Sequence, residues 1–261
     1  MEITTYATFD LPVPYKNIKL YPVSVKDYFY FNLYAQCFSL DKNSIPDIKL
    51  ISMTNLEYIY YLAEGKETNA TYLVYFDRIL SLCIKDDDSF QDLNKSIERY
   101  GYDEKRKPVF KIGEETYDSK DFEALKEIIC EQNLFELPDE NVSKEVRDSL
   151  EKAKEYKDKI SGTKSGTLED YIISISGITG WSFDYIYNMP VRKFIKAIRR
   201  FDNLIHYKIY LSASMSGMVE FKDKSFIKHW LTNLDENQKY GDVSVDLDTV
   251  QDKISLESAK Q

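Results

Sequence analysis

The side chains that most often bind metals or catalyse reactions are few and widely separated in this sequence. Its two histidines, His206 and His229, have no partner at HxxxH, CxxC or Glu-xx-His spacing, the spacings that metal sites typically use. Cys37, Cys83 and Cys130 each lie within an apolar helical pattern, so we expect reduced thiols in a protein core. We therefore expect no metal ion and no cofactor.

Two short stretches resemble ligand-binding loops but lack the spacing that such loops require. Asp86–Ser89 is acidic like a calcium loop, without the Gly at position six and the Glu at position twelve. We predict a solvated turn there. Gly162–Gly166 places its lysine before the second glycine, unlike a phosphate-binding loop. Because the chain also lacks a Gly-x-Ser-x-Gly elbow and an acid pair in an apolar setting, we expect a protein that is not an enzyme.

One basic cluster is the candidate binding surface. It flanks an apolar helical stripe after Pro190, where long cationic side chains can stay hydrated, and we predict that it contacts a partner. Its members are Arg192, Lys193, Lys196, Arg199 and Arg200.

Two kinds of partner fit these basic residues. The chain has 35 Lys and Arg against 44 Asp and Glu, a net charge of −9, so nucleic acid is the less favoured partner and would bind with a steep salt dependence. An acidic protein segment fits the same charges, and the acidic run around Asp139 to Glu155 provides one, either within the chain or in a second copy of it. Self-association is therefore physically reasonable.

The stripe beside these charges predicts a long helix over residues 190–211. Pro190 suits its first turn, and Gly217 is well placed to end it. Apolar residues recur at spacings of three and four, which places them on one face that we expect to be buried. They are Val191, Phe194, Ile195, Ile198, Phe201, Ile205 and Ile209. We predict core positions at Phe194, Ile198, Phe201 and Ile205, and at Trp230 in a last short helix.

Composition predicts a mainly α-helical fold. Hydrophobic residues make up 43% and charged residues 30%, with nine Gly and seven Pro, which is typical of a folded, helix-rich chain. We predict two helical modules with a small β-hairpin between them. Residues 1–100 form an extended arm and a helical module, 101–232 the hairpin and a second module, and 233–261 a loosely ordered acidic tail.

Local signals place the helices and the hairpin. The prolines before residue 23 predict an extended arm, and Ser24 precedes an apolar run over 25–40 that leaves hardly any polar face. That helix is either central to its module or part of an interface. Further helices are predicted after Thr54, Asn69, Ser119, Thr167 and Ser182, and a charged amphipathic helix over 139–159. Pro108–Ile112 and Thr116–Tyr117 predict the hairpin.

The chain has no apolar run of about 18 residues, and residues 1–10 lack the basic and apolar regions of a signal peptide. We therefore expect no contact with a membrane and a location in the cytoplasm of the cell that makes the protein.

Three blocks carry a resemblance to a known class of proteins. They are DFEALKEIICEQN after the hairpin, LEDYIISISGITGWSFDYIYNMPVRKFIKAIRRF, and the ending SGMVEFK…HW. Over about residues 108–232 the pattern resembles bacteriophage tail and baseplate-hub assembly proteins, including chaperones that act on the tape-measure protein. The resemblance implies a non-enzymatic protein that contacts other phage tail or baseplate proteins in the infected host cell or in the virion.

These observations lead to two functional hypotheses. The first is a protein–protein interaction factor in phage tail or baseplate assembly, either an assembly chaperone or a structural component. The alternative is a nucleic-acid-associated phage or host factor that uses the basic flank of helix 190–211.

Overall fold

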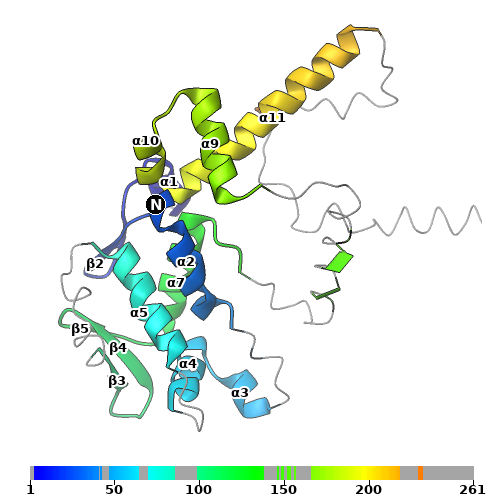
Figure 1. Ribbon diagram of the computed structural model, residues 1–261. Helices are drawn as coiled ribbons and strands as arrows, with labels where there is room; N and C mark the ends of the chain where they lie inside the picture. The colour runs from blue at the N-terminus through cyan, green and yellow to red at the C-terminus, as the bar shows by residue number, and fades with distance from the viewer. Residues whose placement is uncertain are drawn as a thin grey trace, which may run out of the picture. The chain divides into compact units, whose positions relative to one another are not determined.

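The computed structural model describes most of the chain, and its fold is mainly α-helical, as predicted (Figure 1). The described residues are 3–40, 42, 47–64, 70–85, 99–137, 146, 148–149, 152–153, 156, 166–217 and 229–231. The chain divides into two compact units, the first made of residues 1–139 and 172–198 and the second of residues 140–171 and 199–261. Two of the boundaries, at 171/172 and 198/199, fall inside helices, which therefore contribute residues to both units.

Four helices and a small sheet enclose the core of the first unit. The helices are α2 (Tyr28–Tyr34), α4 (Asn55–Glu64), α5 (Thr71–Cys83) and α7 (Ser119–Asn133). At the centre, the ring of Phe76 lies 4.7 Å from that of Phe122 and 5.1 Å from that of Phe110, centroid to centroid. The 3₁₀ turns Val25–Asp27 and Ala35–Phe38 flank α2, and short helices α1 (Ile3–Thr8) and α3 (Ile48–Ser52) complete the unit's N-terminal half.

Side-chain caps explain where the main helices begin. Thr54 and Glu57 exchange side-chain to backbone hydrogen bonds at the start of α4, which forms a capping box and confirms the helix predicted after Thr54. At α7 the capping box is formed by Asp118 and Asp121, one residue before the predicted cap Ser119. Aspartate caps as well as serine does, and only the backbone geometry separates the two candidates.

In the described part of the chain, two antiparallel sheets accompany the helices. β4 (Pro108–Ile112) and β5 (Glu115–Tyr117) form the predicted hairpin, and β3 (Tyr100–Tyr102) adds a third strand in the order β3-β4-β5. In the predicted N-terminal arm, β1 (Val13–Tyr15) pairs with β2 (Ile18–Leu20). The arm thus contains a hairpin of its own, preceded by α1.

The core of the first unit draws on both sides of the domain boundary predicted at residue 100. Leu20, Phe31 and Phe76 from one side pack with Phe110 and Phe122 from the other in one hydrophobic cluster. The division into independently folding modules stays a prediction, but these side chains share one core.

The C-terminal helices are α9 (Leu168–Thr179), α10 (Phe183–Asn188) and α11 (Val191–Met215). Thr167 and Asp170 cap α9 and Ser182 caps α10, as predicted. α11 confirms the predicted long helix, continues to Met215, and is followed by Gly217 with a positive φ of 66°. Along α9, Ile172 and Ile175 are buried, whereas Tyr171 is exposed.

Several predicted features lie outside the described residues. They are the turn at Asp86–Ser89, nearly all of the charged run 139–159, the loop at 162–165, the segments after Gly217 other than 229–231, and the tail 233–261. Among the described helices, none combines the length and the apolar character needed to cross a bilayer.

Candidate functional site

The five predicted partner-binding residues do not form one free basic face. Arg192 is buried, and its Nη1 donates a hydrogen bond of 2.5 Å to the carbonyl oxygen of Glu131 at the C-terminal end of α7. A cation placed there satisfies a carbonyl and complements the negative end of the helix. Lys193 forms an ion pair with Asp10. These two cations therefore stabilise the first unit from within.

The remaining three cations have different surroundings. Arg200 donates from Nη1 to the carbonyl oxygen of Trp230 over 3.0 Å. Lys196 is half-buried, and Arg199 is exposed. Whether Lys196, Arg199 and Arg200 contact a partner stays a prediction.

The apolar stripe of α11 is buried only at its N-terminal end, which corrects part of the predicted core. Phe194 is 2% exposed, whereas Ile198 and Phe201 are half-buried and Ile205 is 43% exposed. Val191 belongs to the main hydrophobic cluster of the first unit, and Ile195 packs against that cluster. Periodicity identified the correct face of the helix but not how far along it the core extends. Trp230 is half-buried.

A buried junction holds the start of α11 against the first unit. Val25 donates its amide to the carbonyl of Met189 over 3.0 Å, and Val191 donates to the carbonyl of Val23 over 2.9 Å. The side chain of Asn133, at the end of α7, accepts from the amide of Val23 over 2.8 Å. These contacts give the backbone between β2 and α2 the partners that buried amides require, and they position α10 and α11.

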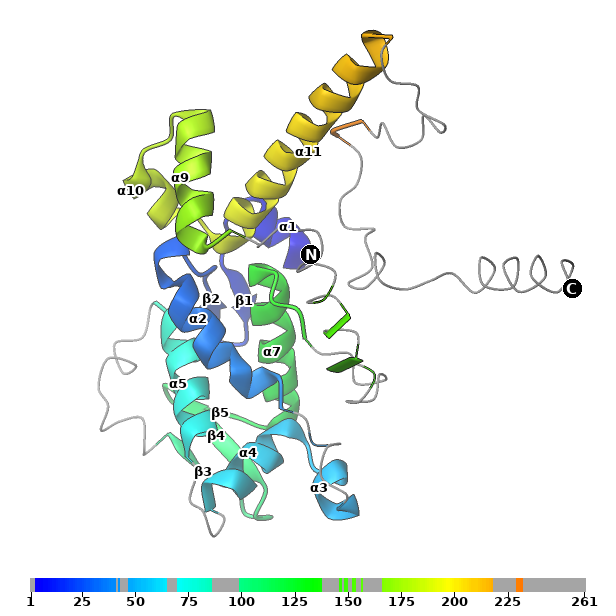
Figure 2. The same cartoon turned by 45° about the vertical axis from the view of Figure 1, so that its right-hand side comes forward.

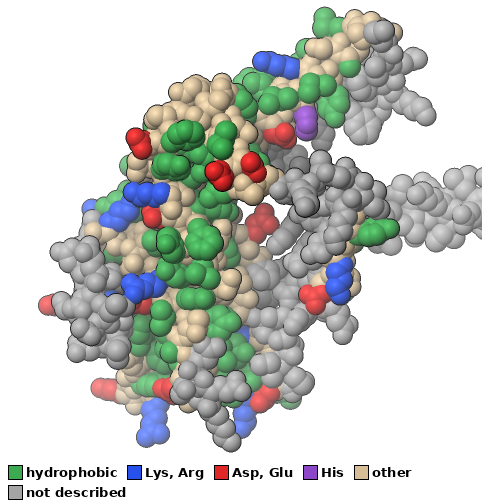
Figure 3. Space-filling view, in the orientation of Figure 1, with side chains coloured by type: hydrophobic (Ala, Val, Ile, Leu, Met, Phe, Trp, Pro, Cys, Tyr) green, Lys and Arg blue, Asp and Glu red, His purple; other side chains and the backbone are tan. Residues whose placement is uncertain are grey.

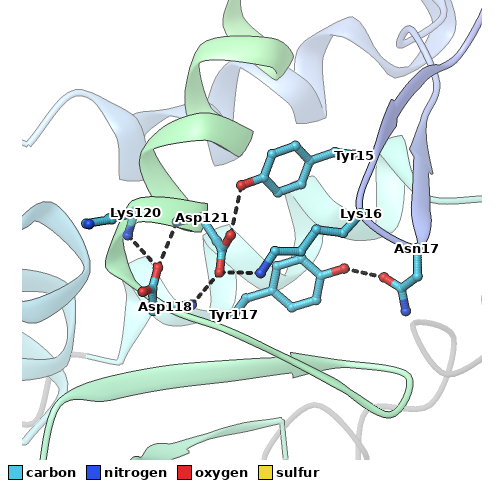
Figure 4. A network of polar contacts seen from close by, with 7 residues as sticks. All are labelled: Tyr15, Lys16, Asn17, Tyr117, Asp118, Lys120 and Asp121. Carbon is cyan, nitrogen blue, oxygen red and sulfur yellow. Dashed lines mark hydrogen bonds and ion pairs between the residues drawn. The ribbon is translucent and has the colours of Figure 1, made fainter.

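A second polar cluster docks the turn between β1 and β2 onto the start of α7, as Figure 4 shows. Asp121 accepts hydrogen bonds from the hydroxyl of Tyr15 over 2.8 Å and from Nζ of Lys16 over 2.7 Å. The same ammonium lies 4.6 Å from the centre of the Tyr117 ring, a cation–π distance. The hydroxyl of Tyr117 donates to Asn17.

The chemistry of this cluster is structural. Burial alone would raise the pKa of Asp121, but hydrogen bonds from Lys16, the amide of Asp118 and Tyr15 outweigh it and lower that pKa. Burial raises the pKa of Tyr117 to about 12. The cluster therefore holds an ionised carboxylate among donors and a neutral phenol, and both carboxylate oxygens of Asp121 already have partners.

The three cysteines are buried and free, as predicted. Burial raises the pKa of Cys83 and of Cys130 to about 12, so these thiols are protonated and unreactive at neutral pH. Across the described part of the chain, no three His, Cys, Asp or Glu side chains are grouped so that they could hold a metal ion.

The most distinctive surface of the first unit is a row of aromatic rings that crosses from α2 to α5, two helices that lie side by side (Figure 2). Tyr30 lies 5.6 Å from Phe29 and 6.2 Å from Tyr34, centroid to centroid. Tyr34 lies 5.7 Å from Tyr75, which lies 6.2 Å from Tyr72. We call these five residues the aromatic row. Figure 3 shows hydrophobic side chains gathered over α2 on this face.

The aromatic row is accessible at one end. Phe29 is 70% exposed and Tyr30 is 52% exposed, whereas Tyr34, Tyr75 and Tyr72 are half-buried. The nearly continuous apolar character of residues 25–40 predicted a helix that is central or part of an interface. The burial of Phe31 confirms the central position, whereas the interface stays a prediction. Phe31 is completely buried while Phe29 and Tyr30 face outward. The sequence could not indicate that α5 continues the row.

Comparison with known proteins gives one match. Residues 159–235 match the family model described as the YomV second domain, which belongs to a phage-encoded protein family. The matched range contains α9, α10 and α11, and residues 1–158 lie outside it. The chain matches no curated protein and no solved structure.

Proposed function

We propose that the protein acts without catalysis, by protein–protein contact, in bacteriophage tail or baseplate assembly, as an assembly chaperone or a structural component. The observation that carries the contact role is the aromatic row. The family match supports a phage setting, and the pattern-level resemblance described above supports tail or baseplate assembly as the process.

The aromatic row suits a protein partner for physical reasons. Tyrosine and phenylalanine are enriched at the centres of protein interfaces, because each buries a large area with few rotatable bonds. Four of the five rings in the row are tyrosines, whose hydroxyls keep the free surface hydrated. Covering Phe29, which is 70% exposed, would remove apolar area from water and favour association.

The alternative function, nucleic-acid binding through the basic flank of α11, has less support from the geometry. Arg192 is buried against Glu131, and Lys193 is paired with Asp10. Phosphate binding needs several cations free to neutralise charge at once. Arg200 in turn donates to the carbonyl oxygen of Trp230, so at least three of the five predicted cations already have partners within the chain.

The first test is where the protein is found during infection. We expect mass spectrometry to detect it in infected-cell lysate together with a tail or baseplate protein in a stable complex. A chaperone is absent from purified virions, whereas a structural component is present in them. The proposal would be contradicted if the protein were detected neither in a complex with a tail or baseplate protein nor in purified virions.

The second test asks whether the aromatic row makes the contact. The double variant Phe29→Ala with Tyr30→Ala should weaken the complex by about 2 kcal/mol or more, as loss of an interface hot spot does. Tyr61→Ala removes another exposed ring, from α4, and serves as the control. The complex should persist at high salt. If no protein complex forms, and the protein instead binds DNA or RNA with an affinity that falls steeply as the salt concentration rises, the alternative function is favoured.

A further inference from the structure

The second half of α11, residues 199–215, belongs to the second unit and exposes large apolar side chains on two of its sides. Ile205 and Ile209 form one pair spaced by four residues, and Leu211 and Met215 form another pair around the helix from the first. All four are exposed, Met215 by 80%, and Figure 3 shows hydrophobic side chains along this helix. We call these four residues the α11 patch. A helix with large apolar side chains on more than one side is normally covered by other protein.

The chain returns to α11 shortly before its predicted C-terminal tail. The ring of His229 lies 5.2 Å from that of Tyr207, centroid to centroid. Arg200 donates from Nη1 to the carbonyl oxygen of Trp230 over 3.0 Å. The tail, residues 233–261, therefore follows directly on a segment that lies against α11, and both belong to the second unit.

The tail and the second half of α11 carry opposite net charges. Residues 233–261 contain seven Asp and Glu against three Lys, a net charge of −4. Residues 199–215 contain Arg199, Arg200 and Lys208 against Asp202, a net charge of +2. Attraction between opposite charges steers such segments together and suppresses pairing with segments of like charge.

The tail also contains apolar residues that match the α11 patch in kind. Its stretch from residue 242 to residue 254 reads DVSVDLDTVQDKI, in which valine, leucine and isoleucine alternate closely with aspartate. A segment of this composition can cover apolar side chains while its carboxylates stay hydrated or meet cations beside them. The acidic and apolar residues are thus present in the same short stretch.

Tail length and tethering favour the helix of the same chain over that of a second copy. The second half of α11 is about 25 Å long at 1.5 Å per residue. The residues between Leu231 and Val243 can span about 40 Å when extended, so the stretch reaches any part of the helix. A tethered segment also has an effective concentration in the millimolar range, which exceeds that of a separate molecule in dilute solution.

We propose that the C-terminal tail docks on the α11 patch of its own chain. The valine, leucine and isoleucine side chains of residues 242–254 cover the patch, and the aspartates between them meet Arg199 and Lys208. The docked tail shields the patch from a second copy of the chain and so limits self-association. This contact is separate from the aromatic row and does not depend on the proposed function.

The experiment measures proximity, because a terminal segment can undock without unfolding the rest of its unit. A spin label is attached to full-length, ¹⁵N-labelled Thr249→Cys protein, a substitution that leaves the charges of the tail unchanged. The label reacts at this site because the three native thiols are buried. We expect the amide signals of Ile205 and Ile209 to broaden, relative to the same sample after chemical reduction of the label.

A mixed sample distinguishes the chain's own tail from that of a second copy. It combines ¹⁵N-labelled protein without the spin label and spin-labelled protein without ¹⁵N, and we expect no broadening in it. Asp246→Asn with Asp248→Asn should reduce the broadening in the first sample about threefold, as expected for loss of two surface ion pairs. Ser255→Asn with Ser258→Asn changes the tail without changing its charge and is the matched control, which should leave the broadening unaltered.

The inference would be overturned if the signals of Ile205 and Ile209 stayed sharp in the first sample. Broadening in the mixed sample would overturn it as well, since the tail would then bind a second copy. Equal broadening with and without the two aspartates would refute the contribution of charge on which the proposal rests. A complex with a tail or baseplate protein that depends on the aromatic row would survive each of these results.

Discussion

The hydroxyl of Tyr60 joins two strands of the sheet to α4. It donates to the carbonyl of Val109 over 2.6 Å and accepts from the amide of Gly101 over 3.2 Å. Gly101 and Val109 are opposite each other in the pairing of β3 with β4, so one side-chain oxygen bridges the two strands. Burial raises the pKa of this phenol, which remains a donor over the whole physiological range.

Tyr60→Phe should lower the free energy of unfolding by about 1–3 kcal/mol, because it leaves a buried carbonyl and an amide without their partner. Urea denaturation followed by circular dichroism measures the change. Tyr61→Phe is the matched control, since Tyr61 is 48% exposed, and it should change stability by less than about 0.5 kcal/mol. Equal effects of the two variants would show that the bridge contributes nothing.

Asp121 makes stability depend on pH. Its pKa is lowered in the folded state despite the opposing effect of burial, because Lys16, the amide of Asp118 and Tyr15 donate to it. A lowered folded-state pKa stabilises the protein above the unfolded value of about 3.9, and this stability is lost as the pH falls through the folded-state pKa.

Asp121→Asn should therefore destabilise the protein by about 1.5–3 kcal/mol at pH 7, as expected for hydrogen bonds to a charged group. The difference from wild type should stay constant down to about pH 5 and shrink below about pH 4. Urea unfolding at a series of pH values tests this, with Asp103→Asn as a control for an aspartate that caps only an exposed turn. A difference of the same size at pH 3 would contradict the assignment.

At the scale of the element, α11 combines two environments in one amphipathic pattern. Its first turn enters the core through Val191 and Phe194, while Ile205 and Ile209 are 43% and 56% exposed. One apolar stripe with constant spacing is therefore buried in its first turn and exposed to solvent further along the helix. Hydrophobic periodicity reports the face of a helix, and the length of the neighbouring elements decides how much of that face is covered.

Phe194→Ala should cost about 3–5 kcal/mol, the usual range for a large side chain removed from a packed core. Ile205→Ala should cost less than about 1 kcal/mol, because its exposed side chain leaves little cavity behind. Thermal unfolding of both variants makes the comparison. A large loss for Ile205→Ala would mean that the second half of the stripe is buried as well.

At the scale of the molecule, the first unit depends on residues far apart in the sequence. Val23 and Val25 pair with the backbone around Pro190, and Gln132 donates to the carbonyl of Leu20 over 3.1 Å. The core combines Phe31 and Phe76 with Phe110 and Phe122. Non-local contacts of this kind make the unit cooperative, so a cut through it should disrupt all of it.

A fragment of residues 1–100 should therefore be unfolded, because it lacks Phe110, Phe122 and Leu125 of the shared core. Residues 1–198, which contain the whole first unit, should fold. Circular dichroism and the dispersion of amide NMR signals distinguish the two outcomes. A folded 1–100 fragment would instead support the predicted boundary at residue 100.

Much of the local structure follows from the sequence alone. The capping pairs Thr54 with Glu57 and Thr167 with Asp170, the β4–β5 hairpin and the long helix after Pro190 are set by contacts within a few residues. Such contacts involve little loop closure, so their signals are visible in a short window of sequence. The burial of the three cysteines follows in the same way from the apolar patterns around them.

Only the tertiary structure decided which side chains on these elements are buried in the core, which contact other elements and which are exposed. Arg192 and Arg199 carry the same charge, but only Arg192 lies beside the end of α7. It donates a hydrogen bond to Glu131 there and so stabilises the fold, whereas Arg199 is exposed. The aromatic row requires α2 and α5, which are distant in sequence, to lie together. The physical reason is that helical periodicity determines which face a residue occupies, whereas long-range packing determines whether that face meets core, solvent or a partner.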